Sequence, residues 1–251
     1  QRGKAVTLVV DEGVPHYLSF LPGADSVLSE LTAGAWDLLI TTDASDEARI
    51  GVAGAYAQAH SKTSINLDHH ATNTLFGDIH LLNAGAVSAT EIVFDWWQYA
   101  GYDMGHEVAL PLMTGLVTDT MGFRTSNVTA RSLEVTQQLM QAGASLTEVT
   151  ARTLDSRPYE TVRLWKQSLP SVQLDGQVIH ATVSLEDAEK AGIEETTDAG
   201  LVSFLMQVEE ARIAVVFKEK ADEFVEISLR AKLGYDVASV AFELGGGGHK
   251  Q

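Results

Sequence analysis

The sequence predicts an α/β fold, a mostly parallel sheet that carries helices on both faces, followed by a smaller α+β domain. Short strand-like segments such as Trp36–Thr42, which is a continuous apolar run, and Thr63–Leu67 are typical of parallel strands that are buried on both faces. Segments with helical apolar spacing, such as Ser88–Tyr99, alternate with these runs. After Pro170 the pattern changes to paired apolar runs around short turns, which indicates a second domain.

Each apolar run in the first part is expected to form a strand, and each segment with an apolar stripe at helical spacing is expected to form a helix. The expected strands are Lys4–Asp11, Trp36–Thr42, Thr63–Leu67 and Asp78–Leu82. The expected helices are Asp25–Leu31, part of Ala44–Ala59, Ser88–Tyr99, His106–Met121 and Ala130–Ala142. Gly143 directly follows the last helix, as a helix C-cap does.

The second domain is expected to begin after a helical linker. We place the first domain at residues 1–150, the linker at 151–168 and the second domain at 169–251. A hairpin is expected around the turn dipeptide Asp175-Gly176. The further elements expected are the strands Ala211–Lys218 and Glu223–Leu229 and the helices Leu185–Ala191, Ala199–Val208 and Val237–Leu244.

Composition narrows the classes of partner and of metal ligand. The 251 residues carry a formal net charge of −17, whereas a protein that wraps long nucleic acid needs a basic face. Because there is no cysteine, disulfides and thiolate sites are excluded, and any metal must be held by His, Asp or Glu. No secretory signal opens the chain and no apolar stretch approaches a membrane span, so we expect a cytoplasmic protein with no membrane partner.

The strongest local signal is the triplet Asp68-His69-His70, which follows the strand expected at Thr63–Leu67. Open α/β sheets build their sites at the carboxyl ends of parallel strands. Neutral imidazole is a common metal ligand, and a neighbouring carboxylate fixes its tautomer. Adjacent histidines in a loop can also be solvated or structural, so the triplet alone leaves metal binding open.

Asp43 and Asp119 add two carboxylates to this pattern. Asp43 ends the run Trp36–Thr42, so two consecutive strands deliver polar groups to one edge; the alternative is that it caps the following helix. Asp119 lies inside an otherwise apolar helical pattern, where a carboxylate is costly unless it is paired or bound. The alternative for Asp119 is a position on the solvent face or at the helix end before Gly122.

Taken together, these residues resemble the DHH phosphoesterase superfamily. Asp43, the triplet at 68–70 and Thr118-Asp119-Thr120 look like motifs II, III and IV of that family, in the right order. Near the C-terminus, Ser228-Leu229-Arg230, Asp236-Val237-Ala238 and the glycine run that ends on His249 look like the associated DHHA1 domain. The resemblance covers nearly the whole chain, and the most similar subgroup is the nanoRNase and pAp-phosphatase (bifunctional oligoribonuclease) type.

The resemblance implies a site for two divalent metal ions, usually manganese, with Mg²⁺ or Co²⁺ as alternatives. It implies that Asp43, His69 and Asp119 are metal ligands, that Asp68 supports the histidines, and that His70 faces the substrate phosphate. A hydroxide held between the metals would attack phosphorus in line. For the substrate, the resemblance implies binding by Arg230 and His249, with Arg124 and the backbone of Gly246, Gly247 and Gly248. The alternative for the glycine run is a flexible tail.

The function implied by the resemblance is metal-dependent hydrolysis of short oligoribonucleotides (nanoRNA), of 3′-phosphoadenosine 5′-phosphate (pAp), or of both. A cyclic-di-AMP or linear dinucleotide phosphodiesterase shares every motif present here and is the first alternative. A non-catalytic nucleotide-binding module is the second. Inorganic pyrophosphatases share the DHH domain, but the glycine-histidine motif argues against them.

The sequence departs from the family at both ends. It opens after the point where the family has motif I, of the form His-x-Asn-Pro-Asp-x-Asp, and it stops soon after the glycine-histidine motif. We therefore expect a fragment with an incomplete metal site; a degenerate natural chain, or numbering that starts with the ordered residues, are the alternatives. Relatives pair through the first domain, so we expect a homodimer, to which Trp96 and Trp97 would contribute unless they lie in the core.

Overall fold

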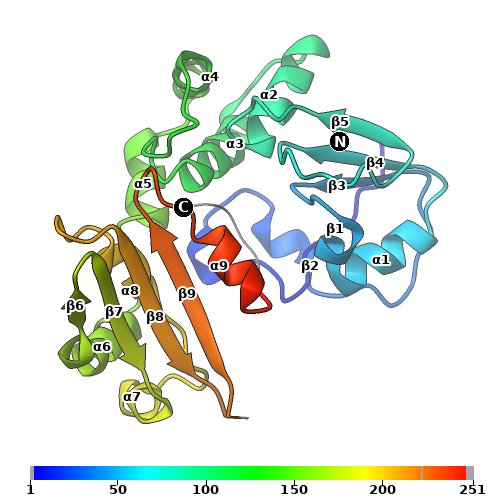
Figure 1. Ribbon diagram of the computed structural model, residues 1–251. Helices are drawn as coiled ribbons and strands as arrows, with labels where there is room; N and C mark the ends of the chain where they lie inside the picture. Colours follow the sequence, from blue (N-terminus) through cyan, green and yellow to red (C-terminus); the bar gives the residue numbers. More distant parts are fainter. Residues whose placement is uncertain (1–2, 222, 247–251) are drawn as a thin grey trace. The chain divides into compact units, whose positions relative to one another are not determined.

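The computed structural model describes residues 3–221 and 223–246, and the chain forms two compact units, Gln1–Ser156 and Arg157–Gln251 (Figure 1). The first unit contains parallel strands and the second a mixed sheet, so the protein has a mixed α/β fold. Within the described ranges, no helix has the length and apolar character that crossing a membrane requires.

The first unit contains two separate parallel sheets where the sequence predicted one. Strands β3 (Leu39–Thr42), β4 (Ser64–Asp68) and β5 (Ile79–Leu82) pair in that order, and β1 (Leu8–Val9) pairs with β2 (Val27–Leu28). A side-chain hydrogen bond links the segment before β1 to the segment before β3: Trp36 Nε1 donates to Thr7 Oγ1 over 3.1 Å.

The prediction of a helix at Asp25–Leu31 is wrong. Only a three-residue 3-10 turn, Ala24–Ser26, forms there, and the chain then enters β2. The hydroxyl of Ser26 donates back to the carbonyl of Gly23 over 2.7 Å, which competes with helix continuation. Val27 then pairs with Leu8, a long-range contact that local spacing does not reveal.

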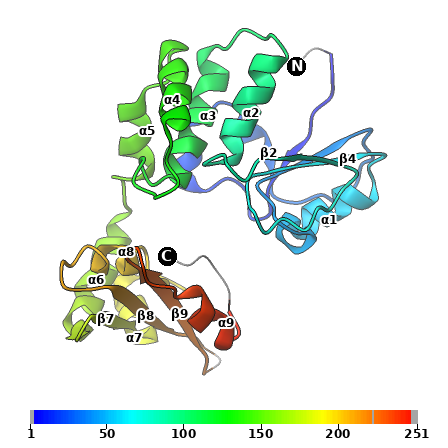
Figure 2. The same cartoon turned by 45° about the horizontal axis from the view of Figure 1, so that its top comes forward.

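Helices α2 (Ala89–Tyr99), α3 (His106–Asp119), α4 (Ala130–Gln141) and α5 (Leu146–Thr153) pack side by side in the first unit (Figure 2). Their starts are fixed by side-chain caps at α2, α4 and α5, where a hydroxyl accepts from a first-turn amide. The helices bury a common apolar core, whose fully buried members include Phe94, Met113, Leu116, Val135, Leu139 and Val149.

Helix α1 (Gly51–Ala59) is shorter than the helical segment expected at Ala44–Ala59. A 3-10 turn, Glu47–Ile50, comes first, and Gly51 breaks the helical path with φ of 67°. The carboxylate of Asp11 then accepts from the amides of Val52 (2.6 Å) and Ala53 (3.0 Å) and caps the new helix. A Cβ at Gly51 would lie 2.2 Å from an Asp11 oxygen, so glycine is required at this junction.

The second unit is a four-stranded sheet in the order β6-β7-β8-β9, with helices packed on it. The expected hairpin around Gly176 forms between β6 (Gln173–Asp175) and β7 (Val178–Val183). Strand β8 (Ile213–Glu219) runs parallel to β7, and β9 (Val225–Ala231) returns antiparallel to β8. The unit's helices are α6 (Tyr159–Ser168), α7 (Leu185–Ala191), α8 (Leu201–Leu205) and α9 (Ala238–Glu243).

The residues expected to form a linker divide between the two units. Residues 151–153 end α5, which packs against α3 in the first unit. Helix α6 belongs to the second unit, where it packs against α7 and buries Leu164 in the apolar core. The unit boundary falls between Ser156 and Arg157.

Replacing Leu116 with alanine is expected to destabilise the first unit by about 2–5 kcal/mol, because the side chain is fully buried in the core and leaves a cavity. The matched control is Leu133→Ala on α4, whose side chain is 52% exposed and whose loss should change the free energy of unfolding by less than about 0.5 kcal/mol. Urea unfolding followed by circular dichroism measures both. Equal effects would show that the core is wrongly assigned.

Candidate metal centre

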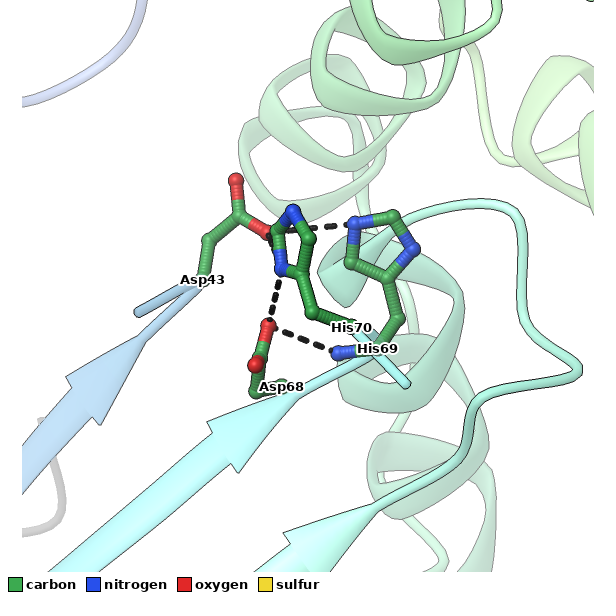
Figure 3. A group of neighbouring side chains, drawn as sticks. All are labelled: Asp43, Asp68, His69 and His70. Carbon is green, nitrogen blue, oxygen red and sulfur yellow. Dashed lines mark hydrogen bonds and ion pairs between the residues drawn. The ribbon is translucent and has the colours of Figure 1, made fainter. Parts of the chain in front are cut away.

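Two neighbouring strands deliver polar side chains to one edge of the first unit. Because β3 and β4 are parallel and in register up to Thr42 and Leu67, they end at the same edge. Asp43 follows β3 directly, and its amide donates to the carbonyl of Leu67 over 2.9 Å. Its φ of 60° is left-handed, a conformation that aspartate adopts more readily than most residues, so the chain turns sharply here. Figure 3 shows Asp43 beside Asp68, His69 and His70.

His69 lies between two carboxylates that come from different elements. Its Nε2 atom is 3.2 Å from Oδ1 of Asp43 and 3.3 Å from Oδ2 of Asp119. Asp119 is the last residue of α3, so the sequence reading that places it at a helix end is right. The structure therefore brings together the three residues expected as metal ligands. The capping role considered for Asp43 is taken instead by Asp46, which accepts from the amides of Ala48 and Arg49.

The chemistry of His69 tests whether this site fits a cation. Its Nδ1 lies 3.2 Å from the carbonyl of Ala86, so Nδ1 carries the donated hydrogen and Nε2 presents its lone pair toward the two carboxylates. Nε2 is buried and has no well-formed hydrogen bond among the described residues. The carboxylate of Asp43, followed by that of Asp119, raises the pKa of His69 above its usual value although burial lowers it. A positive charge is thus favoured at this point, and carboxylate with imidazole suits a divalent ion such as Mn²⁺ or Zn²⁺.

His70 is oriented by the buried carboxylate of Asp68. Its Nδ1 lies 2.7 Å from Oδ1 of Asp68, an atom that also accepts from the amide of His69 over 2.8 Å. Burial raises the pKa of the Asp68 carboxyl, but hydrogen bonds from Asn73, His70 and the His69 amide outweigh burial, so its pKa lies below the usual value. Asp68 is therefore an ionised, fully buried group that fixes the ring of His70.

Two asparagines complete the centre, and sequence reasoning assigned neither of them a role. Asn66 is fully buried in β4, and Asn73 lies five residues after Asp68. The side-chain amide of Asn73 donates to Asp68 Oδ2 over 2.7 Å and to Asn66 Oδ1 over 2.8 Å. The signal available in the sequence was Asn66 itself, because asparagine is depleted in the interior of strands.

A cavity of about 230 Å³ lies beside the carboxylates of the centre. Its walls come from the end of β3, the start of α2 and the last turns of α3; the lining residues are Thr42, Asp43, Ser88, Ala89, Thr90, Val93, Gly115, Thr118 and Asp119. A Cβ at Gly115 would lie 2.3 Å from Cγ2 of Thr90, so this glycine lets α3 approach α2 closely. Close approach of the two helices carries Asp119 toward His69.

The expected substrate-binding residues are divided between the two units: Arg124 belongs to the first, and Arg230 and Gly246 belong to the second. Arg124 is exposed in the turn after α3, where Met121, Gly122 and Phe123 all have positive φ. Arg230 is half-buried on β9 opposite Ala214, and the amide of Gly246 donates to the carbonyl of Ala241 over 2.8 Å. Gly247, Gly248 and His249 lie outside the described residues.

No protein-family model matches the chain. A protein of Thermus thermophilus described as a bifunctional oligoribonuclease and PAP phosphatase NrnA is 33% identical over an alignment of 252 positions, which covers 98% of this chain and 73% of that protein. The Bacillus subtilis protein of the same description is 25% identical over 92% of this chain and 73% of its own length. An exopolyphosphatase-related protein from Bacteroides fragilis has the same fold, with a TM-score of 0.89, 21% identity, and coverage of all of this chain and 77% of that one.

The similarity to the Thermus relative, together with the cluster of Asp43, Asp68, His69 and His70, identifies the chain as a phosphoesterase of the DHH superfamily. Within that superfamily, the chain belongs to the family of NrnA bifunctional oligoribonucleases and PAP phosphatases.

Removing the imidazole of His69 is expected to weaken Mn²⁺ binding by more than the roughly 10- to 100-fold that loss of an outer-shell partner costs. The reason is that Nε2 is the nitrogen toward which both carboxylates converge. Isothermal titration calorimetry on His69→Ala measures this, with His80→Ala, an exposed histidine of the same unit, as the matched control. Equal loss in the two variants would contradict the assignment.

In metal-free protein, the contribution of His69 to stability is expected to fall as the pH rises. Because the folded pKa is raised above 6.5, the protonated ring stabilises the fold fully below that pH, and the contribution is lost as the pH passes through the raised value. The measurement is the difference in free energy of unfolding between wild type and His69→Gln, in chelator, from about pH 5 to pH 9. A difference that stayed constant or grew would refute the expectation.

Proposed function

We propose that this protein hydrolyses short oligoribonucleotides and 3′-phosphoadenosine 5′-phosphate in a metal-dependent reaction. The observation that carries the proposal is the convergence of Asp43 and Asp119 on Nε2 of His69, with the His70–Asp68 pair beside it. Relatives that cover nearly the whole chain are described as oligoribonucleases and PAP phosphatases.

Asp43, His69 and Asp119 would hold the metal, which we propose to be a pair of divalent ions, Mn²⁺ first and Mg²⁺ or Co²⁺ next. When bound, the ions would supply Lewis-acid stabilisation of the charge on the transferring phosphoryl group. The protein's own contribution is to bring two carboxylates and one imidazole nitrogen to one point without a competing hydrogen bond to that nitrogen among the described residues. Asp68 donates no ligand in this scheme, because its oxygens already accept three hydrogen bonds.

His70 is proposed to contact the substrate phosphate. Its Nδ1–H is donated to Asp68, so Nε2 is the ring nitrogen left to contact a phosphate oxygen. Nε2 is therefore the nitrogen that we propose to face the substrate.

The substrate is proposed to be short and anionic. The net charge of −17 disfavours a long nucleic acid, whereas a few local cations are sufficient for one or two phosphates. In the second unit we propose Arg230 and the Gly246–His249 segment for phosphate binding, and in the first unit Arg124. The first unit would then be the catalytic domain and the second the substrate-binding domain.

We also propose a cytoplasmic homodimer. The absence of cysteine in the sequence fits a reducing compartment. Helix α2 exposes Trp96 at 41% and Tyr99 at 92%, aromatic surface that a second copy would cover, while Trp97 is partly buried and donates to the carbonyl of Asp103.

The test is an assay of purified full-length protein with Mn²⁺ on three substrates: the linear dinucleotide pApA, pAp and cyclic di-AMP. We expect hydrolysis of pApA and pAp, loss of activity in chelator, and a fall of at least about 100-fold in kcat for Asp43→Asn. Asp155→Asn, an exposed residue of the same unit, is the matched control and should keep its activity.

The result on each substrate distinguishes the proposed hydrolysis from the two alternative functions. Hydrolysis of cyclic di-AMP in preference to the linear substrates would favour a cyclic-dinucleotide phosphodiesterase. Binding of pAp or pApA without turnover would favour a nucleotide-binding module and would overturn the proposed hydrolysis.

A further inference from the structure

The turn after the triplet carries Asn73, whose side chain contacts both the segment that follows β3 and the triplet itself. Asn73 is half-buried, and it approaches the segment that bears Asp43 as well as the segment that bears His70. We propose that Asn73 is a positioning residue that sets the geometry of Asp43 and of His70 together. The inference rests on the proposed phosphoesterase function and deepens it.

The hydrogen bonds of Asn73 fix the orientation of its amide. Its Nδ2 lies 2.7 Å from Asp68 Oδ2, 2.8 Å from Asn66 Oδ1 and 3.1 Å from the carbonyl oxygen of Ala44. Its Oδ1 accepts from the amide of Leu75 over 2.7 Å. All the partners of Nδ2 are acceptors and the partner of Oδ1 is a donor, so the amide cannot be flipped, and a carboxylate in its place would face three acceptors.

The first path from Asn73 leads through Asp68 to His70. Asp68 is fully buried, and its Oδ2 accepts from Asn73 while its Oδ1 accepts from the ring of His70. A buried carboxylate that loses a donor is costly to keep in place, because the unmet acceptor carries its full desolvation penalty. Without Asn73, the Asp68 carboxylate is held only through Oδ1, by the His69 amide and the His70 ring, so the tautomer and direction of that ring are less firmly fixed.

The second path leads through the backbone to Asp43. The carbonyl of Ala44 accepts from Asn73 Nδ2 and from Asn66 Nδ2, the latter over 3.0 Å. That carbonyl belongs to the turn in which Asp43 has its left-handed φ of 60°, a conformation that is strained unless the surroundings hold it. The two amides therefore hold the turn that directs the Asp43 carboxylate at His69.

The experiment compares Asn73→Asp and Asn73→Ala with Asn127→Asp in the full-length protein. Asn73→Asp replaces a donor by an acceptor at nearly the same volume, and Asn73→Ala removes the donor without adding charge. Asn127 is an exposed residue of the same unit, so Asn127→Asp is the matched control for the added charge. The readouts are Mn²⁺ affinity by calorimetry, the ring ¹⁵N shifts of His70 in metal-free protein, kcat and KM for pApA, and the melting temperature.

For both Asn73 variants we expect Mn²⁺ affinity and kcat to fall by about 10- to 100-fold with KM unchanged, as for other outer-shell partners of metal ligands. The ¹⁵N signals of the His70 ring should move from one fixed tautomer toward the average of two. Asn127→Asp should match wild type in all four measurements.

A folded Asn73→Ala protein with wild-type Mn²⁺ affinity and wild-type His70 shifts would overturn the inference, even if its melting temperature fell, because a merely structural role lowers stability alone. If Asn73→Asp does not fold, the measurements on Asn73→Ala test the inference. If wild type hydrolyses neither pApA nor pAp, the proposed function fails, while metal affinity and the His70 shifts still decide the role of Asn73.

Discussion

The parallel pairing of β3 with β4 is the interaction on which the candidate metal centre depends. The register sets Thr41 opposite Asn66 and ends both strands at one edge, so Asp43 and the triplet emerge together. A slip of one residue would send Asn66 and Asp68 to the opposite face of the sheet. The buried bond from Asn66 Nδ2 to Thr41 Oγ1, at 3.1 Å, also links β4 to β3 and is consistent with only this register.

The three carboxylates of the candidate metal centre lie in different environments, and these environments suit different roles. Asp68 is buried and fully supplied with donors, so it serves as a fixed negative charge that orients His70. The side chains of Asp43 and Asp119 remain partly exposed, at 52% and 37%, and both approach one imidazole nitrogen. Two carboxylates that converge on one imidazole nitrogen favour positive charge at that point, and this geometry suits a divalent ion.

Packing of the helices places Asp119, the third residue proposed as a metal ligand. Gly115 lets α3 lie against Thr90 of α2, and the helix end then places Asp119 beside His69. The apolar core formed by α2 to α5 is thus also the support that fixes one carboxylate of the centre. The residues proposed as ligands therefore lie at two strand ends and one helix end, where regular elements position side chains more precisely than loops do.

The sequence by itself determined the family, and it singled out Asp43, the triplet and Asp119, but not the two asparagines of the centre. Asp43 and the triplet follow strand-like segments, and Asp119 interrupts an apolar helix, so local pattern and motif order were sufficient to find them. Local pattern also predicted the hairpin at Gly176, because its turn chemistry lies within two residues.

Only the tertiary structure decided how those residues are held. The contact of Asn73 with Ala44 spans 29 residues, and the cap that Asp11 provides for α1 spans 41, so no local window contains either. The same holds for β2, where pairing with β1 prevailed over a helical pattern. Sequence pattern reports propensity and periodicity along the chain, whereas the amide network and the direction of each carboxylate depend on groups that only folding brings within hydrogen-bonding distance.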